Sequence, residues 1–176
     1  MSREEEVRDV IIKLKSDKVN ERKAGRQGCV ELLEKDKTEE RIPIKIGHDL
    51  LMAILAWEKT ETQYVKDNNS KAKDKAGKKT KAVDVGNVLW VRQVMRNFIS
   101  NGQKHFQGIL TFKKIYAFKG VVEHILDVLQ DRDAALSSAY HMNHKQLLCD
   151  VLDCRVSHSF CLSPELLYSI LSYLRD

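Results

Sequence analysis

Apolar residues recur at helical spacing along most of the chain. Near the start, four of them fall at positions i, i+3, i+4 and i+7, which form one stripe along a helix: Val7, Val10, Ile11 and Leu14. Three glutamates occupy the first turn, where the helix dipole favours acidic side chains. The pattern predicts a first helix over 4–15, a break at Ser16 and Asp17, and a second helix that ends near Glu34.

The same spacing predicts further helices after a polar segment that ends at Pro43. The expected ranges are 44–64, 82–100, 104–117, 119–130, 143–155 and a last helix from 164 onwards. Ser163 is a good N-cap and Pro164 suits the first helical position, so this last start is well marked. The range 82–100 is apolar nearly all round, so we expect that helix at the centre of the fold.

The predicted fold class is all-α. Only two prolines occur, and alternating β-branched runs are few. Helix pairs with short connections fit either a bundle or a HEAT-type α-solenoid of antiparallel pairs, with about seven to nine helices. The strongly apolar last helix favours a solenoid segment of a longer protein, and we expect one domain over 1–176.

The net charge of +5 comes from one segment. Residues 66–82 hold seven lysines and two aspartates, so the remainder of the chain is neutral. This balance argues against broad nucleic-acid binding by the folded body. The low complexity of 66–81 predicts a mobile lysine-rich loop.

Three interpretations of this lysine-rich segment stay open: a solvated linker, a nuclear localisation signal and a contact to DNA phosphates. No aromatic residue occurs between positions 65 and 89, which argues against base stacking. The candidate lysines are Lys71, Lys73, Lys75, Lys78, Lys79 and Lys81.

No catalytic residues are predicted. The sequence contains no Gly-rich phosphate loop and no His-Arg-Asp or Asp-Phe-Gly segment. Six potential metal ligands do crowd into 21 residues: His141, His144, Cys149, Cys154, His158 and Cys161. They include no Cys-x-x-Cys pair, so we expect surface histidines, buried reduced cysteines, and neither metal nor cofactor.

Two glycines and two tryptophans have predicted structural roles. Gly25 and Gly28 fall inside the second helix, where each costs about 1 kcal/mol relative to alanine. Close approach of a neighbouring helix is the expected compensation. Trp57 and Trp90 are expected in the core.

One stretch resembles a known family motif. Residues 14–23 resemble the N-terminal (TAN) motif of the ATM/Tel serine/threonine kinases, in which a hydrophobic residue precedes an Asp-Arg/Lys pair and then Glu-Arg-Lys. The matching positions are Leu14, Asp17, Lys18, Glu21, Arg22 and Lys23. Residues 147–155 and 163–173 resemble a following helical pair of that family, and the lysine-rich segment resembles a basic loop in it.

The resemblance implies a HEAT-repeat α-solenoid that belongs to a nuclear kinase of the phosphatidylinositol-3-kinase-like family. It implies a role in DNA double-strand-break signalling and telomere maintenance, with the kinase domain outside these residues. The chain itself would be a non-catalytic docking and regulatory arm. Its partners would be the remainder of the kinase solenoid and the break-sensing MRN complex. No membrane association is expected.

The role of the motif residues and the function of the chain each have more than one interpretation. The motif residues fit a solvated helix with local ion pairs, a bridge from Glu21 or Arg22 to a neighbouring helix, or a docking face. The alternative function is a stand-alone helical module that binds nucleic acid through the lysine-rich segment. A small enzyme on a helical bundle is a third option.

Overall fold

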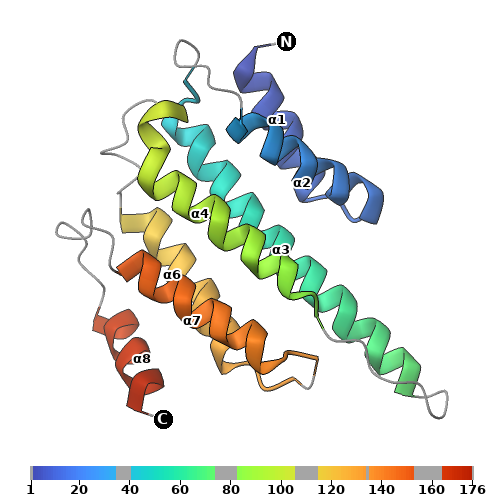
Figure 1. Ribbon diagram of the computed structural model, residues 1–176, viewed down its shortest axis with the longest axis vertical. Helices are drawn as coiled ribbons and strands as arrows, with labels where there is room; N and C mark the ends of the chain where they lie inside the picture. The colour runs from blue at the N-terminus through green and yellow to red at the C-terminus, as the bar shows by residue number, and fades with distance from the viewer. Residues whose placement is uncertain are drawn as a thin grey trace.

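The computed structural model describes residues 2–34, 41–73, 83–105, 115–133, 135–152 and 164–175. Regular structure within these ranges is helical, so the predicted all-α class is confirmed (Figure 1). The described ranges contain seven helices: α1 (Arg3–Leu14), α2 (Val19–Glu34), α3 (Ile44–Lys73), α4 (Val85–His105), α6 (Ile115–Gln130), α7 (Ser138–Leu152) and α8 (Pro164–Arg175).

Helix α1 begins with a reciprocal cap. The backbone N–H of Glu5 donates to Oγ of Ser2 at 3.3 Å, and the backbone N–H of Ser2 donates to Oε2 of Glu5 at 2.7 Å. Such a capping box satisfies two helix-start donors that have no partner within the helix. The predicted start of this helix is therefore correct to within one or two residues.

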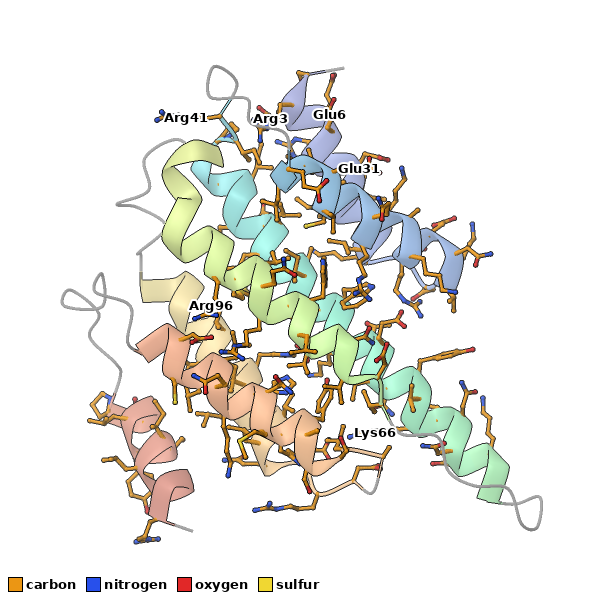
Figure 2. All side chains as sticks on the ribbon, in the orientation of Figure 1. Arg3, Glu6, Glu31, Arg41, Lys66 and Arg96 are labelled. Carbon is orange, nitrogen blue, oxygen red and sulfur yellow. The ribbon has the colours of Figure 1, made fainter. Side chains whose placement is uncertain are left out.

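Helix α3 is longer than predicted. It continues through 66–73, so the prediction of a loop from residue 66 is wrong for that part. Polar side chains support the extension: Lys66 forms an ion pair with Asp131, and Nε2 of Gln63 donates to Oδ1 of Asp67 at 2.7 Å (Figure 2). Lysine and alanine also have good helix propensity, so low hydrophobicity did not require a loop. Residues 74–81 lie outside the described ranges.

Three other predicted boundaries change. Helix α4 starts at Val85 and continues to His105, so the helix predicted at 104–117 begins inside α4 and ends inside α6. Its middle, 106–114, lies outside the described ranges. Helix α7 starts at Ser138 rather than at 143, because Oγ of Ser137 accepts the N–H of Tyr140 at 3.2 Å and caps an earlier turn. The proposed cap Ser163 also lies outside the described ranges.

The helices lie side by side, from the α1–α2 pair at one edge to α8 at the other (Figure 1). Helix α1 packs against α2 and α3, α3 packs against α4 and α6, α7 packs against α4 and α6, and α8 packs against α6. Asp150 of α7 accepts from Nε of Arg92 on α4 at 2.7 Å, and Arg96 lies beside it (Figure 2). Helix α4 packs against both α3 and α7, as expected for a helix at the centre of the fold, although its Leu89 is 47% exposed.

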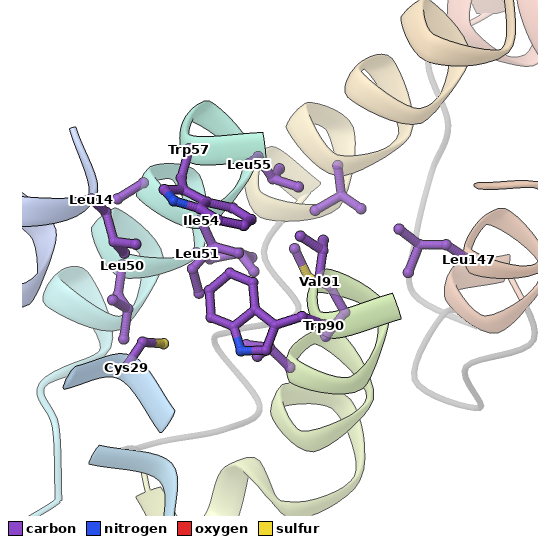
Figure 3. Packing of buried hydrophobic residues seen from close by; sticks show 14 of the residues in the cluster. Leu14, Cys29, Leu50, Leu51, Ile54, Leu55, Trp57, Trp90, Val91 and Leu147 are labelled. Carbon is purple, nitrogen blue, oxygen red and sulfur yellow. The ribbon is translucent and has the colours of Figure 1, made fainter. Parts of the chain in front are cut away.

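The core joins α1, α2, α3, α4, α6, α7 and α8 in one apolar cluster. At its centre, the rings of Trp57 and Trp90 meet edge to face with centroids 4.8 Å apart (Figure 3). The guanidinium of Arg26 lies 5.4 Å and 5.1 Å from these two centroids, within reach of cation–π attraction. Both tryptophans are buried, as predicted.

Helices α1 and α2 approach closely at Gly25. A Cβ atom at that position would lie 2.6 Å from the backbone nitrogen of Leu14, which is closer than real Cβ atoms come. A Cβ at Gly28 would lie 2.9 Å from Cγ2 of Val10. The prediction that close packing compensates for these helical glycines is confirmed.

The prediction of buried cysteines is correct for Cys29 and wrong for Cys149. On α7, Leu147 and Leu148 take the inward face, so the next position in the helical turn points to solvent. Cys154 and Cys161 lie outside the described ranges.

Candidate functional site

A cluster of five polar side chains lies between helices α3, α6 and α7; we refer to it as the polar cluster. Helix α3 contributes Glu58 and Thr62, which are one turn apart, α6 contributes His124, and α7 contributes Tyr140 and His144, again one turn apart. The side chains of Glu58 and His144 are fully buried, and that of His124 is 10% exposed. Buried ionisable groups need partners, so their contacts define what the cluster can do.

Glu58 is the centre of the polar cluster. Its Oε2 lies 2.8 Å from Nε2 of His124, and its Oε1 lies 2.7 Å from Nε2 of His144. Oε1 also accepts a hydrogen bond from the hydroxyl of Tyr140 at 2.8 Å. Burial opposes ionisation of Glu58, but His124 and His144 outweigh it and hold the pKa of the carboxyl below its usual range.

Tyr140 and Thr62 complete the cluster around Glu58. The Tyr140 hydroxyl lies 2.9 Å from Oγ1 of Thr62, so the two hydroxyls form a hydrogen bond. Burial and then the nearby Glu58 charge raise the pKa of Tyr140 above its usual range. Tyr140 therefore remains a phenol that donates to the carboxylate.

His144 is held by its own helix. Its Nδ1 lies 3.0 Å from the backbone carbonyl of Tyr140. A carbonyl oxygen can only accept, so Nδ1 carries a proton and donates it. The ring is thereby fixed with Nε2 directed at Glu58. This Nε2 atom is buried and lies 2.7 Å from Oε1 of Glu58. The angle of the contact does not meet that of a hydrogen bond, so Nε2 has no hydrogen-bond partner among the described residues.

The prediction of surface histidines is wrong for His144. A sequence signal for its burial exists, because Tyr140, His144, Leu147 and Leu148 fall at i, i+4, i+7 and i+8, one stripe of α7. No comparable signal pairs it with Glu58 and His124, which come from two other helices. One ligand atom from each of Glu58, His124 and His144 lies within 4.8 Å of the others, a grouping that could hold a metal ion.

One residue of the family-like motif, Arg22, bridges two helices. Arg22 is buried, and its Nε donates to Oε1 of Glu61 on α3 at 2.6 Å. Its Nη1 donates to the carbonyls of Ser16 and Asp17 at 3.0 Å and 2.8 Å. Of the three interpretations, the described geometry of Arg22 fits the bridge to a neighbouring helix.

The other motif residues divide between the core and the surface. Leu14 is fully buried. Glu21 makes local contacts only, accepting from Nζ of Lys18 at 2.8 Å and from Oγ of Ser16 at 2.6 Å. The side chains of Asp17 and Lys23 are exposed, so these two and Lys18 remain available to a partner.

The structure places only part of the lysine-rich segment. Lys71 is exposed on α3, and Lys73 is the last residue of that helix. The other four candidate lysines lie outside the described ranges: Lys75, Lys78, Lys79 and Lys81.

Known proteins supply no further guide to this site. No protein-family model, no curated protein and no solved structure matches the chain. Of the helices within the described ranges, none has a stretch long and apolar enough to cross a membrane.

Proposed function

We propose that the chain is a non-catalytic helical scaffold, the N-terminal solenoid segment of an ATM-like kinase. The observation that carries the proposal is an apolar surface on α8, formed by Leu167, Tyr168 and Leu171, whose side chains are 44%, 70% and 56% exposed. These positions are neighbours on one side of the helix. Such a surface marks a contact with another protein segment, and in a HEAT solenoid the next helical pair covers it.

The helix order supports a stacked arrangement. Helices α1 and α2 pack on each other, as do α6 and α7, and each of these pairs also packs against α3. Successive pairs that contact their neighbours are the arrangement of HEAT-type repeats. Arg22, one of the positions that match the family motif, would then fix the first pair onto the following helix.

The polar cluster supports a structural role rather than catalysis. The side chains of Glu58 and His144 are fully buried, so neither lies at the surface where a substrate would bind. A catalytic acid or base must reach the substrate within hydrogen-bond distance. The cluster instead joins three helices, α3, α6 and α7, through contacts between buried side chains.

The proposed setting is nuclear, in DNA double-strand-break signalling and telomere maintenance, with the MRN complex as a candidate partner. The exposed motif residues Asp17, Lys18 and Lys23 are the proposed contact. The alternative is a nucleic-acid module that would use the lysine-rich segment, of which Lys71 is exposed on α3. A nucleic-acid module of this kind would bind DNA with an affinity that falls as the salt concentration rises.

The size of the native protein tests the proposal. An antibody raised against this chain should detect a nuclear protein many times longer than 176 residues, of a size that accommodates a kinase domain. A native protein of 176 residues would contradict the kinase assignment.

A binding experiment tests the docking role separately. Purified MRN complex should bind the chain, and a variant with Asp17→Ala, Lys18→Ala and Lys23→Ala should bind it at least about tenfold more weakly, with an unchanged melting temperature. DNA affinity that disappears on deletion of 74–81, without binding of the MRN complex, would favour the nucleic-acid module.

A further inference from the structure

The contact between His144 and Glu58 is chemically incomplete. The proton on Nδ1 of His144 is committed to the carbonyl of Tyr140, so a neutral ring presents the lone pair of Nε2. That lone pair faces Oε1 of Glu58 at 2.7 Å. Two acceptor atoms at this distance repel each other unless a cation or a second ring proton lies between them.

A second ring proton satisfies this contact poorly. The Nε2 atom of His144 is buried without a hydrogen bond of acceptable direction, although Oε1 is close. A proton on a ring nitrogen is confined to the ring plane, whereas a metal ion accepts the lone pair and binds the carboxylate at the same time.

We propose that Glu58, His124 and His144 bind one Zn²⁺ ion. The three potential ligand atoms lie within 4.8 Å of one another and come from α3, α6 and α7. Two imidazoles and one carboxylate are a known zinc ligand set. The ion would link three helices that are far apart in the sequence.

Hydrogen bonds from neighbouring groups already orient two of the proposed ligands, His144 and Glu58. The carbonyl of Tyr140 fixes the His144 ring with Nε2 toward the site. The Tyr140 hydroxyl donates to Glu58 and is itself bonded to Thr62. Hydrogen bonds of this kind orient zinc ligands and are part of a functional metal site.

Zinc binding requires a small rearrangement. Ligand atoms at the tetrahedral angle on zinc are about 3.3 Å apart, given bond lengths of about 2.0–2.1 Å. The carboxylate of Glu58 lies 2.7 Å and 2.8 Å from the two imidazole nitrogens, so it must move outward by about 0.5 Å.

The donor set and the burial favour zinc over Mg²⁺ and Ca²⁺. Imidazole nitrogen disfavours Mg²⁺ and Ca²⁺, which prefer oxygen ligands and high coordination numbers. Glu58 and His144 are fully buried, which suits the low coordination number of zinc. Water at the fourth position would enter beside His124, the one ligand with partial exposure.

Calorimetric titration of the chelator-treated full chain with ZnCl₂ tests the proposal. We expect one Zn²⁺ per chain, no competition from excess Mg²⁺, and proton release that makes the measured heat depend on the buffer. His144→Ala and His124→Ala should each weaken zinc binding at least about 100-fold. His48→Ala, which alters a partly exposed histidine on α3 that is not one of the three proposed ligands, should leave zinc affinity unchanged.

Two further measurements keep the test valid if a ligand variant fails to fold. Co²⁺ in the unaltered chain should show visible d–d absorption without the ultraviolet band of cobalt–thiolate bonds. A variant with Cys149, Cys154 and Cys161 changed to serine should keep its zinc. Absence of zinc binding by the unaltered chain would overturn the proposal, as would a thiolate band or unchanged affinity in folded His144→Ala.

Discussion

Arg22 of α2 and Glu61 of α3 form an ion pair, with Nε of the arginine 2.6 Å from Oε1 of the glutamate. The arginine side chain is 3% exposed and the glutamate side chain 21%. The same guanidinium donates to the backbone carbonyls of Ser16 and Asp17 in the α1–α2 connection. One buried side chain therefore ties the α1–α2 connection to the longest helix of the fold.

Arg22→Ala should lower the free energy of unfolding by about 2–3 kcal/mol, because it leaves a partly buried carboxylate and two carbonyls without their donor. Urea denaturation measures the change. Lys23→Ala, on the next and exposed position, should stay within about 0.5 kcal/mol of the unaltered chain. Equal stability of the two variants would show that the buried bridge contributes nothing.

Gly25→Ala should destabilise the fold by about 1–3 kcal/mol, although alanine favours helices, because the new methyl group meets the backbone of Leu14. Thermal unfolding followed by circular dichroism measures the effect. Gly86→Ala is the control, since a Cβ there would lie 3.1 Å from the end of the Asp84 side chain and would not meet the backbone of another helix. A stabilising Gly25→Ala would contradict the close approach of α1 and α2.

Acid should destabilise the metal-free chain partly through Glu58. The pKa of this carboxyl is lowered in the folded state, by His124 and His144 against the effect of burial. The unfolded chain therefore takes up the proton first as the pH falls. The Glu58 contribution is present above about pH 5 and is lost as the pH falls through about 4 toward the folded pKa.

Glu58→Gln isolates this contribution, because it keeps the shape of the side chain and removes its titration. Urea denaturation at several pH values should give a shallower fall of stability between about pH 5 and 3 for the variant than for the unaltered chain. Identical slopes would show that the Glu58 carboxyl has the same pKa in the folded and unfolded states.

Cys149 should react with iodoacetamide at least about 100-fold faster than Cys29 at pH 8. Burial raises the pKa of Cys29 to about 12, so its reactive thiolate is scarce, whereas Cys149 is exposed on α7. Mass spectrometry of the two peptides measures the rates. In concentrated urea the difference should disappear, and a difference that persists there would have a cause other than burial.

The sequence by itself predicted most of the helices, because each buries a stripe of apolar residues whose 3.6-residue period is visible in one dimension. It missed the polar extension of α3 over 66–73, which has no such stripe. It also determined the glycine contact at Gly25 and the buried tryptophans, since these follow from residue type and local pattern. The stripe through Tyr140 and His144 was present too, although the histidine was assigned to the surface.

Only the tertiary structure decided which side chains from different helices meet. Glu58, His124 and His144 are joined by packing of α3, α6 and α7, and no sequence period relates residues on three separate helices. The same holds for Arg22 and Glu61, and for the Lys66–Asp131 pair that supports the long α3. Local patterns fix what each helix buries, whereas the partners of a buried charge depend on how the helices are placed against one another.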